Sequence, residues 1–160
     1  MQADIVVGLD DSASAWAAAS WAAAQARSTG ARLRAVHVLE RAEAWEAYDP
    51  PEVATVVYPD ANVLDPAWTV RSRKVFDRLD PESSWTLEFA KGDPAQAMVA
   101  VSQDASMLVL GTHEHRGLGR LVHGSVSHYC INHAFCPVVV VPNDVVDPAA
   151  EGSDAASVLG

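Results

Sequence analysis

The sequence contains few cysteines, and their number and spacing exclude several kinds of site. Only Cys130 and Cys136 occur among 160 residues. Two thiols do not build the disulfide framework of a small secreted domain, and no C-x2-C pair of the kind that zinc sites use is present. The pattern is typical of a reducing compartment, and it favours two buried thiols that pack as small apolar groups.

Positive charge is also scarce. The chain has 11 lysines and arginines against 21 aspartates and glutamates, which gives a formal net charge of −10. A nucleic-acid-binding surface needs clustered basic residues to neutralise phosphates, and an anionic membrane surface attracts residues of the same kind. We therefore expect neither a nucleic acid nor a membrane as a partner.

Long hydrophobic runs are missing as well. No apolar stretch of the sequence approaches the ~20 residues that a helix needs to span a bilayer. The first four residues, MQAD, include no basic residue, and the first apolar run covers only residues 5–7. This start does not resemble a secretory signal, so we expect a cytoplasmic protein.

What the sequence does have is an alternation of short β-branched runs with helix-forming segments. Residues 4–10 and 32–39 are predicted strands, and the alanine-rich segment 13–28 between them is a predicted helix that ends at Gly30. This order predicts a parallel βαβ unit with a right-handed crossover. The same criteria predict helices at 66–79, 94–103 and 125–133, and strands at 84–90, 105–110 and 137–141.

One long segment interrupts this alternation. Residues 40–66 carry four of the nine prolines, and residues 40–65 carry seven acidic residues with Arg41 as the single base. We predict a long irregular loop there, with a helical turn near residues 42–48. We assign residues 1–145 to one domain and residues 146–160 to a disordered acidic tail.

Five strands alternating with four helices predict an α/β fold, an open five-stranded parallel sheet with helices on both faces. In such sheets, ligands bind beyond the carboxyl ends of the strands, where the strand order reverses. Residues 107–142 form a strand, a glycine-rich loop, a helix and a strand. The loop leads to a helix N-terminus, where backbone N–H groups and the helix dipole favour a bound phosphate.

This segment also carries a family resemblance. The sequences VLGT at 109–112, GSVS at 124–127 and CPVVV at 136–140 resemble the universal stress protein family. The sequences IVVGLDDS at 5–12, VHV at 36–38 and GDP at 92–94 match the same family pattern. The resemblance covers residues 4–142. It implies a Rossmann-like fold of the adenine nucleotide alpha hydrolase type and a stress-response module that binds ATP, ADP or AMP, with Mg²⁺ as the accompanying ion.

The resemblance also implies roles for individual residues. Asp10 would contact the ribose or the adenine, the backbone of Val38 would bond to the adenine edge, and residues 124–127 would hold the phosphates. The implied nucleotide site comprises Gly8, Leu9, Asp10, Val38, Leu110, Gly111, Glu114, Arg116, Gly124, Ser125, Val126 and Ser127.

One position departs from the family pattern. Gly111, Gly124 and Ser125 fall on the pattern G-x2-G-x9-G-[ST], but Glu114 stands where the second glycine is expected. A carboxylate repels a triphosphate, and its side chain hinders the close backbone approach for which glycine is used. Arg116 and other loop cations would offset the charge. Two hypotheses therefore stay open: a nucleotide-binding regulatory module, and a nucleotide-free dimeric protein-interaction module.

Some of these residues could also have a purely structural role that needs no ligand. Gly111 and Gly124 would suit a tight strand–loop–helix geometry alone, and Asp10 would serve as a helix cap. Histidines gather in the same region, but His128 and His133 are five apart and do not share a helix face well, so we predict no metal site. These histidines and the nearby thiol are His113, His115, His123, His128, His133 and Cys130.

The last predicted strand bears on the oligomeric state. An unbroken β-branched run in a final strand is expected at a sheet edge. The resemblance implies that this edge pairs with its copy in a symmetric homodimer through Val138, Val139, Val140 and Val141.

The sequence has no P-loop and no nucleophile elbow, so we expect no enzyme activity beyond slow ATP hydrolysis.

Overall fold

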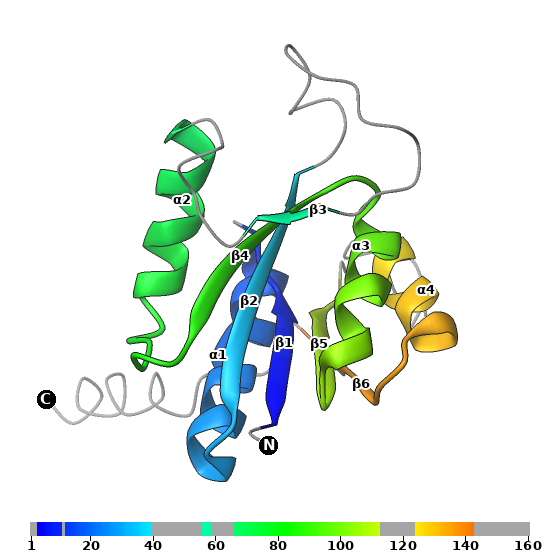
Figure 1. The fold of residues 1–160 in the computed structure, drawn as a ribbon, viewed down its shortest axis with the longest axis horizontal. Helices are drawn as coiled ribbons and strands as arrows, with labels where there is room; N and C mark the ends of the chain where they lie inside the picture. The colour runs from blue at the N-terminus through cyan, green and yellow to red at the C-terminus, as the bar shows by residue number, and fades with distance from the viewer. Residues whose placement is uncertain (1–2, 11, 40–55, 59–65, 113–123, 143–160) are drawn as a thin grey trace, which may run out of the picture.

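A computed structural model describes residues 3–10, 12–39, 56–58, 66–112 and 124–142. They form one six-stranded sheet in the order β3-β4-β2-β1-β5-β6 (Figure 1). Five of its strands run parallel, which confirms the predicted α/β class. These are β1 (Asp4–Gly8), β2 (Arg32–Leu39), β4 (Thr86–Lys91), β5 (Met107–Gly111) and β6 (Val138–Val141).

The sixth strand corrects the sequence prediction. β3 (Val56–Tyr58) pairs antiparallel with β4, with Val56 opposite Lys91, inside the segment predicted to be an irregular loop. Three β-branched or aromatic residues are too few to show a periodic pattern, so pairing with the edge of β4 decides their conformation. The predicted turn near residues 42–48 and the predicted tail at 146–160 lie outside the described residues.

The helices form two layers, one on each face of the sheet. The core between the sheet and helices α1 (Ala13–Thr29) and α2 (Pro66–Asp77) includes Leu33 and Phe89. The core on the opposite face lies under α3 (Pro94–Val101) and α4 (Ser125–His133) and includes Met98 and Cys130. In Figure 1, α3 and α4 lie together on one side of the sheet. The helix predicted at 94–103 ends earlier, in a 3₁₀ turn (Ser102–Asp104).

Local signals explain the ends of α1. The Ser12 side chain accepts a hydrogen bond from Ala15 N and caps the helix. Gly30 ends it in the left-handed region, at φ 70°, where glycine carries no Cβ penalty. Between these ends, Ala18 and Ala22 are fully buried. Their small side chains let the helix axis approach the sheet closely.

The strand order locates the ligand-binding edge. From β1 the chain builds outward through β2 and β4, and it then returns to the other side of β1 for β5 and β6. The order therefore reverses between β1 and β5, and a crevice forms beyond the carboxyl ends of these two strands. β6 occupies the far edge of the sheet, as predicted, and Val138, Val139 and Val140 are only partly buried.

Ion pairs join three parallel strands near their amino ends. Arg34 donates two hydrogen bonds of 2.9 Å to the Glu88 carboxylate across β2 and β4. Arg32 donates two of 2.7 Å to Asp4 on β1. The side chains of Arg34 and Glu88 are 18% and 12% exposed, so water screens this pair weakly. The hydrogen bond to Glu88 raises the pKa of Arg34 above its ordinary value, and the guanidinium stays charged.

We predict that Glu88→Ala lowers the free energy of unfolding by about 1–3 kcal/mol, because Arg34 loses a bidentate partner while it remains largely out of water. Urea denaturation measures this difference. Glu82→Ala, at an exposed position, is the matched control and should change stability by less than about 0.5 kcal/mol. Equal effects of the two variants would contradict the assignment.

Candidate functional site

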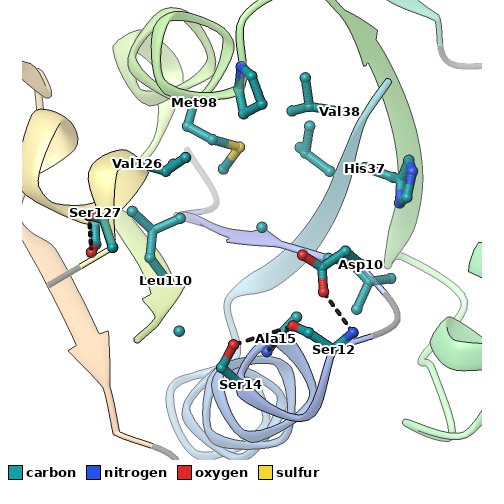
Figure 2. A pocket seen from close by; sticks show the side chains of 16 residues that line it. Asp10, Ser12, Ser14, Ala15, His37, Val38, Met98, Leu110, Val126 and Ser127 are labelled. Carbon is teal, nitrogen blue, oxygen red and sulfur yellow. Dashed lines mark hydrogen bonds between the residues drawn. The ribbon is translucent and has the colours of Figure 1, made fainter. Parts of the chain in front are cut away.

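A pocket of about 480 Å³ opens where the strand order reverses (Figure 2), a volume typical of small-molecule clefts. Its lining comes from the carboxyl ends of β1, β2 and β5 and from the first turns of α1, α3 and α4. The described lining residues are Gly8, Leu9, Asp10, Ser12, Ser14, Ala15, Val36, His37, Val38, Pro94, Met98, Leu110, Gly111, Gly124, Val126 and Ser127.

Asp10 forms part of the turn that starts α1. Its Oδ1 accepts a hydrogen bond of 2.7 Å from Ser12 N, and Ser12 Oγ caps Ala15 N at 3.1 Å. The helix cap is therefore Ser12, while Asp10 fixes the turn before it. Within the described part of the chain, Oδ2 of Asp10 has no hydrogen-bond partner, so this oxygen remains an acceptor at the pocket wall.

Close packing requires glycine at position 111, where the glycine-rich loop begins. A Cβ at this position would lie 2.6 Å from the carbonyl carbon of Ser14 and 3.0 Å from its Cβ. The end of β5 thus touches the backbone of the first turn of α1. Gly8 is less constrained, because a Cβ there would meet the flexible ends of Leu110, at 3.1 Å, and Met98, at 3.6 Å. Gly8 lines the pocket, so its missing side chain leaves space there.

The N-terminus of α4 faces the pocket without a side-chain cap. Gly124 is the N-cap residue and supplies no capping side chain, so the first N–H groups of the helix have no partner within it. The Ser127 hydroxyl does not compensate, because it donates to Gly124 O at 2.9 Å. Backbone N–H groups and the helix dipole therefore make this corner suitable for an anion.

The rest of the lining is largely apolar. Val38, Met98 and Pro94 border the pocket on the side of β2 and α3. Val126 and Leu110 lie near one another on the side of α4 and β5 (Figure 2). This arrangement offers a slot for a flat, weakly polar group beside the anion corner. Among the lining residues that the structure describes, Asp10 is the single aspartate or glutamate, and none is a lysine or arginine.

The structure brings most of the predicted site residues together. Ser125 is exposed and is not part of the described lining, because the first turn of α4 directs it outward. Glu114 and Arg116 lie outside the described residues. The predicted residues that line the pocket are Gly8, Leu9, Asp10, Val38, Leu110, Gly111, Gly124, Val126 and Ser127.

Sequence reasoning missed several lining residues. Pro94 and Met98 belong to the helix after Gly92 and Asp93, and that helix start was visible as a turn, a cap and an N1 proline. Ser14 gives no comparable signal, because it follows the cap and looks like an ordinary helical serine. The missed lining residues are Ser12, Ser14, Ala15, Val36, His37, Pro94 and Met98.

No group of three or more potential metal ligands occurs among the residues that the structure describes. Cys130 is fully buried, and burial, with a smaller effect of Asp93, raises its pKa to about 11. A metal binds the thiolate, so this environment opposes coordination. Cys136 is partly exposed, which corrects the prediction of two buried thiols. His113, His115 and His123 lie outside the described residues.

Comparison with known proteins identifies the family. The model of the universal stress protein family matches residues 1–142. Universal stress protein Rv2005c of Mycobacterium tuberculosis is 34% identical over 144 residues, which make up 89% of this chain and 49% of that protein. The chain therefore belongs to the universal stress protein family, and it spans about half the length of the curated relatives it matches.

Solved structures share the fold. A universal stress protein in complex with cAMP is 20% identical, with a TM-score of 0.64 over 87% of this chain and 96% of that one. The universal stress protein from Archaeoglobus fulgidus in complex with dAMP is also 20% identical, with a TM-score of 0.54 over 87% of this chain and 97% of that one.

In the described part of this chain, no helix is long and apolar enough to cross a membrane.

We predict that Gly111→Ala lowers the free energy of unfolding by about 1–3 kcal/mol, because the new methyl group would overlap the backbone of Ser14. Gly8→Ala is the matched comparison and should cost less, since flexible side-chain ends can move aside. Urea denaturation of both variants measures the difference. A larger loss for Gly8→Ala would contradict the close contact between β5 and α1.

Proposed function

We propose that this chain is a regulatory module that binds an adenine nucleotide, ATP accompanied by Mg²⁺. The observation that supports this function best is the pocket at the reversal of strand order, with the uncapped start of α4 at one end and an apolar slot at the other. A nucleotide presents the same two chemistries, a phosphate chain and a flat base.

In this proposal the base lies in the slot beside Val38 and Met98, with the Val38 backbone at its polar edge. The ribose hydroxyls donate to Oδ2 of Asp10, the carboxylate oxygen that the turn at Ser12 leaves available. The phosphates lie on the N–H groups that follow Gly124. The phosphate oxygens are the kind of ligand that Mg²⁺ prefers.

The relatives agree with this choice of ligand class. Two structures of similar fold are described as complexes with cAMP and with dAMP, and both ligands contain adenine and one phosphate. The comparison supports an adenine nucleotide for this chain, and the triphosphate is our own extension. A ligand-dependent regulator in the cytoplasm, rather than a metabolic enzyme, is likewise part of the proposal.

Isothermal titration calorimetry on nucleotide-stripped protein tests this function. We expect saturable binding of ATP, ADP or AMP, and weaker binding of ATP by Asp10→Asn, which retains the acceptor for Ser12 N but replaces the carboxylate. The melting temperature of the variant serves as the folding control. No heat with any of the three nucleotides at millimolar concentration would overturn the proposal.

A second function is supported by Glu114 and by the edge strand. β6 is an exposed edge of the sheet, and Ile131 and Phe135 on the adjoining surface are 48% and 67% exposed. A homodimer that pairs Val138, Val139, Val140 and Val141 with their copies would cover this edge. If Glu114 prevents nucleotide binding, the chain would act as a nucleotide-free dimeric interaction module.

Glu114→Gly separates the two functions. If Glu114 blocks the site, this variant should gain or strengthen ATP binding by at least tenfold, the order expected for removal of a repulsive charge. Glu82→Gly, at an exposed position, is the control for glycine substitution. Sedimentation of the wild type with and without ATP should show the dimer in both states. Unchanged ATP affinity in Glu114→Gly, or a monomer at all concentrations, would count against this second function.

A further inference from the structure

The first turn of α1 contains a pair of serine hydroxyls that the capping role does not fully use. Ser12 Oγ accepts from Ala15 N, and it also lies 3.1 Å from Ser14 Oγ. Ser14 is 4% exposed, yet both serines line the pocket (Figure 2). No other hydrogen bond of these two side chains occurs within the described part of the chain.

The contact between Ser12 and Ser14 leaves one hydroxyl proton unused. The two hydroxyls carry two protons, and the contact between them uses one, whichever oxygen donates. When Ser12 is the donor, the remaining proton is that of Ser14, and it has no acceptor among the described residues. Because Ser14 lines the pocket, a ligand oxygen there can accept this proton.

We propose that Ser14, oriented by Ser12, donates this proton to a phosphoryl oxygen of the bound nucleotide, an inference that rests on the proposed function. The donors then form one chain, from Ala15 N–H to Ser12 Oγ, from Ser12 O–H to Ser14 Oγ, and from Ser14 O–H to the ligand. Each donor polarises the next, and all lie at the positive end of α1.

The position of Ser14 selects the phosphate rather than the ribose. Ser14 packs against Gly111, where β5 enters the loop that leads to the anion corner. Asp10 lies on the other side of Ser12 and presents a carboxylate oxygen, which accepts from hydroxyl groups. A ribose hydroxyl therefore suits Asp10, and an anionic oxygen suits the donor at Ser14. Within the described lining, which has no lysine or arginine, neutral donors such as the Ser14 hydroxyl are available to a phosphate.

Ser14→Ala tests this inference with two ligands. We expect the affinity for AMP to fall by about tenfold or more, the effect of losing a hydrogen bond to a charged group. The affinity for adenosine, which has no phosphate, should change by less than about twofold. Calorimetry gives the first constant, and competition against AMP gives the second. Ser28→Ala, in the last turn of the same helix, is the matched control, because its hydroxyl donates only to Gln25 O.

Each outcome decides the question. The variant is expected to fold, since alanine is favourable in a helix, and its melting temperature checks this. Equal AMP affinity in Ser14→Ala and wild type would overturn the role of Ser14 and leave the proposed function intact. An equal loss for AMP and adenosine would assign the contact to the nucleoside and overturn it as well. A wild-type protein that binds neither ligand would overturn both.

Discussion

The close contact between the end of β5 and the first turn of α1 is the constraint on which the site depends. Gly111 leaves no room for a side chain against the backbone of Ser14. This contact holds the N-terminus of α1 beside the start of the loop that leads to α4. The starts of α1 and α4 therefore face the same pocket at the reversal of strand order. Because each helix start carries a partial positive charge, the fold gives an acidic chain a locally positive corner.

The turn that starts α1 offers the pocket both a hydrogen-bond acceptor and a hydrogen-bond donor. Asp10 and Ser12 share a single turn, in which the aspartate fixes the backbone and the serine caps the helix. Among the described residues, one carboxylate oxygen of Asp10 has no hydrogen-bond partner, and the pair of Ser12 and Ser14 has one hydroxyl proton more than their contact uses. Acceptor and donor lie a few residues apart along one turn. A ligand that carries hydroxyls next to a phosphate, as a nucleotide does, fits this order.

The sequence predicted the parallel sheet, the helices and most of the pocket because each rests on local signals. An alternating apolar pattern predicted β4, and a capping residue and a glycine predicted the two ends of α1. The family resemblance assigned Asp10 and Gly124 to the site. It did not predict β3, because three residues form a strand only when β4 offers an edge. It also missed Ser14 and Met98, since helix packing across the sheet decides which side chain of a first turn reaches the pocket.

The proposed function requires that an adenine nucleotide occupies this pocket. The most direct measurement is a titration of isotope-labelled protein with AMP, followed by the backbone amide resonances. We expect saturable shifts at Gly8, Asp10, Val38 and the N–H groups that follow Gly124, with small changes at the amino ends of the strands near Arg34. Absence of shifts at millimolar AMP, or shifts confined to the surface around Phe135 and β6, would contradict it.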